Sequence, residues 1–325
     1  GVGYLVLQGG HDSDVSSFVG ARQLERVRFA PGSGRFAAGV WIYGANHGQW
    51  NTTWGDRDLP WPWAGFLDRA ALLPAGEQRR IARVYVTAFL DETLRGDGQA
   101  PGPYRRLFRQ PEAAPGWLPG SPGALLLTLY RDATFTPWAG YEEDVDVATA
   151  SLPGARLEAS GLAVWREDEL EVRGGSGRDD HGVILGWRRS PGGDGEPPSY
   201  ALTLPPGVEP AELLAFDLAA VDETPPADDG TENQGEEDEE SRALEPWDLT
   251  IELETADGVV ARLPLSTWRA LAPPLPSRFA KLELLHEGRH SPHETVFQTF
   301  ELPLADFARA APGFEPARLR VVRFV

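Results

Sequence analysis

The chain has 325 residues, 41% of them hydrophobic, which suggests roughly two domains with ordinary hydrophobic cores. Its net charge of −19, from 49 acidic against 30 basic residues, opposes binding to nucleic acid or to anionic membranes, because like charges repel. The absence of cysteine excludes disulfides and thiolate chemistry and leaves the compartment open, and no apolar run approaches the roughly 20 residues of a membrane span.

The first stretch of the chain predicts a strand, a helix and a second strand. Residues 4–8 form an apolar run that stops at two glycines, and apolar residues at helical spacing follow over 21–27. A second apolar run over 39–43 stops at Gly44. This order predicts two neighbouring parallel strands joined by a helix.

A carboxylate follows the first predicted strand and an imidazole follows the second. Asp12 lies just past residues 4–8, and His47 lies just past residues 39–43. Ligands bind outside the carboxyl ends of parallel strands, so both side chains are expected at one edge of the sheet. In a serine hydrolase a histidine removes the hydroxyl proton, and an acid fixes the histidine tautomer. Acid before histidine is the second half of the α/β-hydrolase order.

Both loops resemble those of one enzyme superfamily. Residues 9–15 are similar to the Gly-x-x-Asp-x-x-Val acid loop of α/β-hydrolase esterases, and residues 44–49 resemble their histidine loop, as in dienelactone-hydrolase-like and acetylhydrolase-like bacterial enzymes. The resemblance covers roughly the first hundred residues. It implies hydrolysis of a small-molecule or polymer ester without a cofactor, with His47 as the base and Asp12 as the acid that orients it.

Asp14 is the alternative acid in the same loop. Asp12 fits the spacing better, and Asp14 also suits the role of a cap for a helix that starts near Ser16. Residues 11–14 can also be interpreted as a binding loop for a hard metal ion. A third and a fourth ligand do not follow nearby, so no metal is predicted there.

The nucleophile of that family is missing from the sequence. Gly-x-Ser-x-Gly, the strand-to-helix elbow that carries the serine, does not occur in the 325 residues. We therefore expect the chain to be the C-terminal part of a hydrolase whose serine and oxyanion-hole donors lie upstream of Gly1, and to be inactive alone. The apolar run at 319–325 likewise predicts a truncated end.

Four tryptophans follow the histidine closely. Trp50 and Trp54 are the candidates for a substrate pocket, with Trp50 the better of the two. Trp61 and Trp63 either belong to the same pocket or fasten the loop to the body of the protein. Residues 76–94 then predict an amphipathic helix that closes the hydrolase part, which is expected to span residues 1–98.

Residues 99–123 are rich in glycine and proline and predict a linker with about one helical turn. From residue 124 the pattern becomes strand-like, and residues 124–325 are expected to form an all-β sandwich with a hairpin turn at 256–258. The predicted strands are 124–130, 163–165, 183–187, 200–204, 213–218, 249–254, 259–265, 280–285, 296–302 and 319–325, with one helix over 304–310.

The end of the chain carries a second resemblance. Residues 297–307 and 319–324 are similar to the closing strands of galactose-binding-like jelly rolls, over about thirty residues. The expected fold class is therefore α/β plus all-β: the C-terminal part of an α/β-hydrolase sheet followed by a jelly-roll-like sandwich.

Three polar clusters of this second part are expected to be structural. Residues 222–240 hold ten acids and no base, which is typical of a disordered loop. A zinc site could be formed by His286, His290 and His293, but these residues lie in a predicted hairpin loop. The acidic residues of 142–146 could bind calcium, but this segment suits an exposed entry to a strand.

Two other functions remain open. The β-sandwich alone would bind a carbohydrate or another polymer on exposed aromatics such as Trp138 or Trp165, with the first part as a relic. Alternatively, the same triad would cleave an amide, since the loops do not separate esters from amides.

Overall fold

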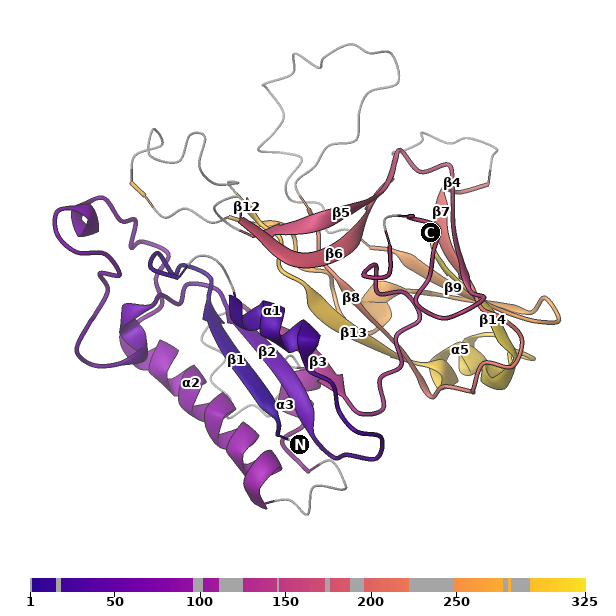
Figure 1. Ribbon diagram of the computed structural model, residues 1–325, viewed down its shortest axis with the longest axis horizontal. Helices are drawn as coiled ribbons and strands as arrows, with labels where there is room; N and C mark the ends of the chain where they lie inside the picture. The colour runs from indigo at the N-terminus through magenta and orange to yellow at the C-terminus, as the bar shows by residue number, and fades with distance from the viewer. Residues whose placement is uncertain are drawn as a thin grey trace, which may run out of the picture. The chain divides into compact units, whose positions relative to one another are not determined.

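A computed structural model describes residues 2–15, 19–95, 102–110, 125–144, 146–172, 176–187, 196–221, 248–276, 280–281 and 293–325. The chain forms two compact units, each with its own core (Figure 1). Strands hold 33% and helices 21% of the described residues, which confirms a fold that mixes helices with a larger share of strands. Unit 1 comprises Gly1–Phe135, Glu171–Asp179 and Pro274–Thr299, and unit 2 comprises Thr136–Leu170, Asp180–Pro273 and Phe300–Val325.

A three-stranded mixed sheet forms the centre of unit 1. Its order is β1 (Tyr4–Gly9), β2 (Phe36–Ile42) and β3 (Leu126–Asp132). β1 and β2 are parallel, with Gly9 opposite Ile42, whereas β3 runs antiparallel to β2. Every residue of β2 is buried, which is why its sequence is a continuous apolar run rather than an alternating one.

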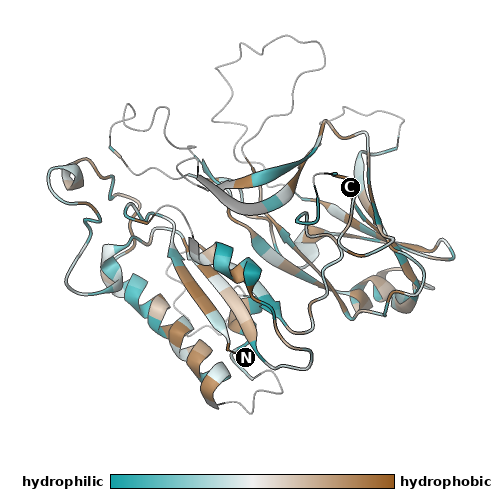
Figure 2. Cartoon of the chain, viewed as in Figure 1, coloured by the Kyte–Doolittle hydropathy of each residue, from teal (hydrophilic) through white to brown (hydrophobic). Residues whose placement is uncertain are grey.

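Helices cover both faces of this sheet. Because side chains alternate along a strand, Phe36, Ala38, Val40 and Ile42 share one cluster with α2 (Ala75–Leu90) and α3 (Arg106–Arg109), whereas Ala37 packs with α1 (Val19–Arg26). Figure 2 shows hydrophobic residues along β1 and β2 and a mixed surface on α2, as expected for an amphipathic helix at a sheet. α2 continues into a π-helical turn, η3 (Asp91–Arg95).

The predicted boundary between the two parts was wrong. The strand expected to open the β-sandwich is β3, which completes the sheet of unit 1 by pairing with the free edge of β2. Within the predicted linker, residues 102–110 pack into unit 1, where Leu107 and Phe108 are buried in its core. A high glycine and proline content predicts a linker, but it does not show which edge of a sheet a neighbouring strand will pair with. The rest of 99–123 lies mostly outside the described residues.

Unit 2 is built on a five-stranded antiparallel sheet. Its order is β10-β9-β14-β7-β4, and β8 pairs with β13 in a separate two-stranded sheet that contributes to the same core. A further hairpin joins β5 and β6. The strands are β4 (Arg156–Ser160), β5 (Val164–Val172), β6 (Ser176–Gly186), β7 (Ser199–Thr203), β8 (Leu213–Leu218), β9 (Thr250–Thr255), β10 (Val260–Pro264), β13 (Gln298–Pro303) and β14 (Leu319–Phe324).

Most of the predicted strands of this part correspond to observed ones. The hairpin turn at 256–258 joins β9 to β10, where Gly258 has φ +82°, a value that favours glycine. Helix α5 (Leu304–Ala310) matches the predicted helix. β4 was missed because its sequence, RLEAS, offers one strong apolar side chain. The acidic run 222–240 lies outside the described residues.

Candidate functional site

The parallel pairing of β1 and β2 brings the two predicted loops together. Past the strand ends, the backbone N–H of Gly10 donates to Ile42 O at 2.9 Å, and that of His11 donates to Ala45 O at 2.8 Å. A Cβ on Gly9 would lie 2.6 Å from Ala45 O, so only glycine allows this approach. The acid loop and the histidine loop therefore form one hydrogen-bonded structure.

Asp12 and His47 meet within that structure. The Oδ2 atom of Asp12 lies 3.0 Å from Nδ1 of His47, and its Oδ1 atom accepts the backbone N–H groups of Asp14 at 3.0 Å and Val15 at 2.7 Å. An ionised carboxylate only accepts hydrogen bonds, so Nδ1 carries the proton and Nε2 is left with its lone pair. The side chain of Asp12 is 9% exposed and that of His47 is 29% exposed. The imidazole is thus oriented by a buried acid and reachable from solvent.

Asp14, the alternative acid, lies on the opposite side of the imidazole. Its Oδ2 atom is 3.8 Å from Nε2 of His47, and its side chain is 54% exposed. That distance exceeds a hydrogen bond and the group is solvated, so Asp14 contributes little fixed orientation. The geometry favours Asp12 over Asp14 as the partner of His47.

Helix α2 holds the histidine loop through a buried glutamine. The side-chain amide of Gln78 accepts from the backbone N–H of Asn46 at 3.1 Å and donates to Asn46 O at 2.7 Å, as a neighbouring strand would. Gln49 Nε2 in turn donates to Leu73 O at 3.2 Å. Gln78 precedes Ile81 by three residues on the buried stripe of α2, a spacing that marks it in the sequence.

Sequence reasoning missed two further residues of the site. His11 is buried, accepts the backbone N–H of Gly44 at its Nδ1 atom at 3.2 Å, and packs edge-on against Tyr43, whose phenol pKa burial raises. Asp58 accepts hydrogen bonds from both loops. His11 therefore has a structural role and joins the acid loop to the histidine loop. Asp58 follows His47 by eleven residues in an irregular loop, and no sequence pattern points to it.

The tryptophan-rich loop divides into a buried and an exposed part. Trp50, in η1 (Gly48–Trp50), is half-buried and packs against the core of unit 1. Trp54 instead stacks on the imidazole, with centroids 5.7 Å apart and planes at 10°.

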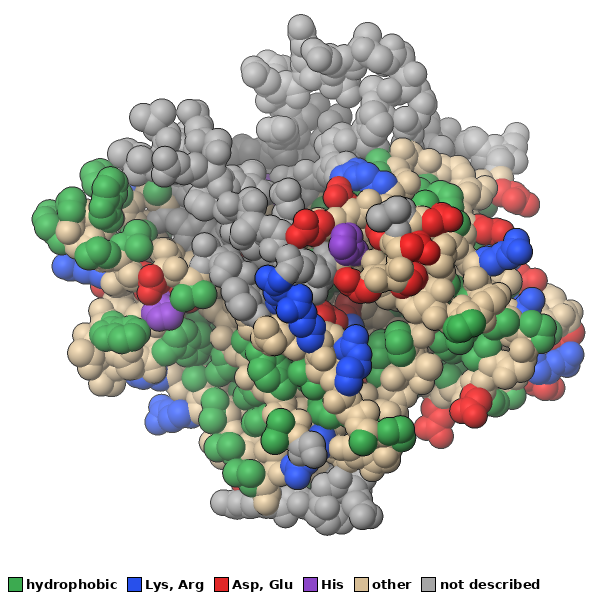
Figure 3. Space-filling model, in the orientation of Figure 1, with side chains coloured by type: hydrophobic (Ala, Val, Ile, Leu, Met, Phe, Trp, Pro, Cys, Tyr) green, Lys and Arg blue, Asp and Glu red, His purple; other side chains and the backbone are tan. Residues whose placement is uncertain are grey.

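Trp61 and Trp63 do not fasten this loop. They are 78% and 61% exposed, beside η2 (Trp63–Gly65) and Phe66. Figure 3 shows hydrophobic side chains gathered over the left end of the molecule, where Figure 1 draws this loop. The loop is held instead by its backbone, through an isolated bridge between Leu67 and Ala280. Exposed aromatics thus lie in the loop that follows the imidazole.

The histidines considered as zinc ligands lie only partly within the described residues. Among the described residues no three His, Asp or Glu side chains are placed to hold a metal, and His286 and His290 lie outside those residues. His293 lies in β12 (His293–Glu294), which pairs with β11 (Leu275–Pro276). Within the described part of the chain no helix is long and apolar enough to span a bilayer.

Trp138 and Trp165 are not the exposed aromatics expected of a carbohydrate platform. Both are half-buried and pack against the core of unit 2. The indole N–H of Trp165 is buried as well.

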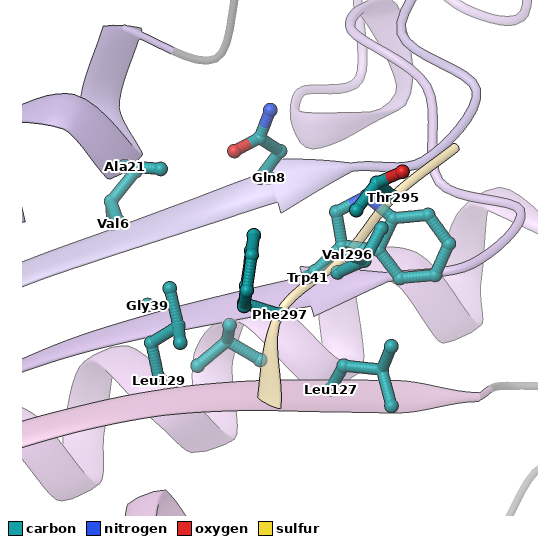
Figure 4. A pocket seen from close by; sticks show the side chains of 11 residues that line it. Val6, Gln8, Ala21, Gly39, Trp41, Leu127, Leu129, Thr295, Val296 and Phe297 are labelled. Carbon is teal, nitrogen blue, oxygen red and sulfur yellow. The ribbon is translucent and has the colours of Figure 1, made fainter. Parts of the chain in front are cut away.

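A small cavity lies at the sheet of unit 1, apart from the Asp12–His47 pair. Its volume is about 40 Å³, and Figure 4 shows side chains of β1, β2 and β3 around it together with Thr295, Val296 and Phe297. Neither Asp12 nor His47 lines it. Such a volume holds a water molecule or two rather than a substrate.

No protein-family model, curated protein or solved structure matches this chain.

Proposed function

We propose that Asp12 and His47 are the acid and the base of a serine-type carboxylic-ester hydrolase. The observation that carries the proposal is the 3.0 Å contact between Asp12 Oδ2 and His47 Nδ1, in adjacent loops at the carboxyl ends of parallel strands. Other arrangements of a histidine and a carboxylate are common on surfaces, but here the acid is buried and doubly tethered by backbone N–H groups. That pre-organisation is what a catalytic base requires.

The chemistry follows from the tautomer. With its Nδ1 proton held by Asp12, His47 presents the Nε2 lone pair, which removes a proton from a serine hydroxyl as that oxygen attacks the ester carbonyl. The Asp12 carboxylate stabilises the imidazolium that forms. His47 then gives the proton to the leaving alcohol, and the same steps with water release the acid. No cofactor takes part in this proposal.

The proposal places the nucleophile outside residues 1–325. The sequence has no Gly-x-Ser-x-Gly, and among the described residues no hydroxyl forms a hydrogen bond with His47 Nε2. The three-stranded sheet with helices on both faces supports the assignment of unit 1 to part of an α/β-hydrolase fold. For unit 2, the core shared by the five-stranded antiparallel sheet and the β8–β13 pair supports a jelly-roll-like β-sandwich.

The test uses the full-length polypeptide that contains these residues. We expect it to hydrolyse short-chain nitrophenyl esters and to react covalently with a fluorophosphonate. His47→Ala and Asp12→Asn should each lower kcat by about 10⁴-fold, because they remove the base or its correct tautomer. His181→Ala, an exposed histidine of unit 2 that also faces a carboxylate, is the matched control and should leave activity unchanged.

Two results contradict the proposal. One is a full-length protein that neither hydrolyses esters nor labels with the fluorophosphonate. The other is hydrolysis that persists undiminished in His47→Ala. An ester hydrolase and an amide hydrolase would use the same dyad. Acyl nitroanilides, tested in the same assay, distinguish the two activities.

A further inference from the structure

A single carboxylate outside the dyad ties both of its loops together. Asp58 Oδ2 accepts the backbone N–H of Ser13 at 3.1 Å and that of His47 at 3.1 Å. Its Oδ1 atom accepts the backbone N–H of Gly48 at 2.9 Å and the side-chain amide of Asn46 at 2.6 Å. Three of these four donors flank or include His47, and the fourth directly follows Asp12.

The four donors require an ionised carboxylate. Each oxygen receives two N–H groups, and hydrogen bonds to a charged acceptor are about twice as strong as neutral ones. An asparagine would keep one accepting oxygen and turn an NH₂ group toward the remaining donors, which leaves two of them unpaired. Through these bonds Asp58 binds three backbone N–H groups and the Asn46 amide, and none of them involves the imidazole of His47.

We propose that Asp58 is a positioning residue that sets the distance and orientation between Asp12 and His47. The role in catalysis rests on the proposed function, whereas the positioning itself does not. Asp12 reaches His47 from a loop whose next residue, Ser13, is bound by Asp58, and His47 is bound by the same oxygen. One atom therefore fixes the separation of the two backbone segments that carry the dyad.

The neighbouring Asp56 provides a matched control. It lies on the same loop and carries the same charge, but its carboxylate pairs with Arg69 at 2.7 Å on the surface. Asp56→Asn removes one negative charge as Asp58→Asn does, without touching either loop of the dyad.

The experiment is proton NMR of the 325-residue chain, which needs no nucleophile. The Nδ1–H proton of His47, bound to a buried carboxylate, should give a downfield resonance that Asp12→Asn abolishes. In Asp58→Asn we expect this proton to exchange with water about tenfold faster or more, the factor that corresponds to one lost hydrogen bond. Asp56→Asn should leave the resonance and its exchange unchanged.

Asp58→Glu covers the case in which Asp58→Asn fails to fold. It keeps the charge and both accepting oxygens but moves them by one methylene, so the exchange rate should fall between those of the wild type and Asp58→Asn. A folded Asp58→Asn or Asp58→Glu variant with wild-type exchange of the Nδ1–H proton overturns the proposal.

The catalytic part has its own readout. In a full-length protein that hydrolyses esters, Asp58→Asn should lower kcat at least about tenfold with KM little changed, because the dyad is disturbed and the binding surface is not. Unchanged kcat overturns the catalytic role of Asp58. If instead no full-length variant hydrolyses esters while the NMR changes occur, the proposed function fails and the positioning stands.

Discussion

The two units bury different kinds of side chain. Among the described residues, only two of the buried polar side chains, Glu252 and Thr255, belong to unit 2, and all the others belong to unit 1. The core of unit 2 is otherwise apolar, from Leu157 on β4 to Phe307 on α5. Burying a polar group costs free energy unless it is hydrogen-bonded, so unit 1 must meet many more geometric requirements than unit 2.

Two groups stand out among the buried polar residues of unit 1. One holds the loops past β1 and β2, through His11, Asn46, Gln49 and Gln78. Fixed polar groups at strand ends are what a catalytic or binding site requires, since misplacement by an ångström is costly there.

The second group is a buried ion pair in unit 1. Arg105 Nε lies 3.4 Å from Glu92 Oε2, Glu92 also accepts the backbone N–H of Gly102 at 2.8 Å, and Arg105 donates to Tyr130 at 3.0 Å. Its guanidinium also covers the ring of Phe36, 4.1 Å from the centroid. This network fastens residues 102–110 to the sheet rather than forming a site.

Removing the positive partner of this ion pair should have the largest effect on the comparison between the units. Arg105→Met should lower the free energy of unfolding of unit 1 by about 3–5 kcal/mol, because it leaves Glu92 charged and buried without its partner. Hydrogen exchange of the β2 amides, with β9 amides as the reference in unit 2, measures the loss. Arg106→Met, on the adjacent exposed side chain, is the control. A loss below about 1 kcal/mol would mean that the polar burial of unit 1 imposes no strict requirement.

The sequence predicts the candidate site and the folds of the two units to different extents. The contact of Asp12 with His47 followed from two apolar runs and the helix between them, because parallel neighbours place both strand ends at one edge. Asp58 did not follow, since its partners are backbone N–H groups of distant loops that no side-chain pattern records.

Pairing between strands was the other limit. The run at 124–130 predicts a strand, but its assignment to unit 1 depends on the edge of β2, a long-range choice. Likewise Leu107 and Phe108 occupy a segment too short for periodicity to reveal burial. In unit 2, β8 is an apolar run with one polar residue, Asp217, and it was predicted with the observed bounds.

A smaller effect sharpens the comparison from the side of unit 2, where the phenols of Tyr141 and Tyr200 contact each other at the apolar core. The Tyr141 hydroxyl lies 2.7 Å from that of Tyr200, and burial, with Glu143 and Glu167 nearby, raises the pKa of Tyr141 to about 12. The folded chain therefore keeps a proton that the unfolded chain loses between pH 10 and about 12, so stability falls as pH rises through this window.

For Tyr141 alone the decrease should reach about 3 kcal/mol by the end of the window, from two pKa units at about 1.4 kcal/mol each. Urea unfolding of the chain at several alkaline pH values, followed through a spectroscopic probe in unit 2, measures it. Tyr141→Phe should make the slope shallower without removing it, because burial also raises the pKa of Tyr200. At neutral pH it should cost about 1 kcal/mol, because Tyr200 loses a partner. Tyr104→Phe, an exposed tyrosine of unit 1, is the control, and an equally steep slope in Tyr141→Phe would contradict the assignment.

The smallest expected effect concerns Trp54, at the exposed edge of the polar site. Trp54 is 62% exposed yet stacks on His47, so Trp54→Ala should cost no more than about 1 kcal/mol of stability while broadening or shifting the His47 ring resonances. Trp61→Ala removes a more exposed indole that has no ring contact with the imidazole and should leave those resonances in place. Equal shifts in both variants would show that the whole loop, rather than the stacked ring, restrains the imidazole. In that case the exposed tryptophans would restrain His47 together with Asp58. The contrast between fixed, buried polar groups and mobile, exposed aromatic side chains would then disappear.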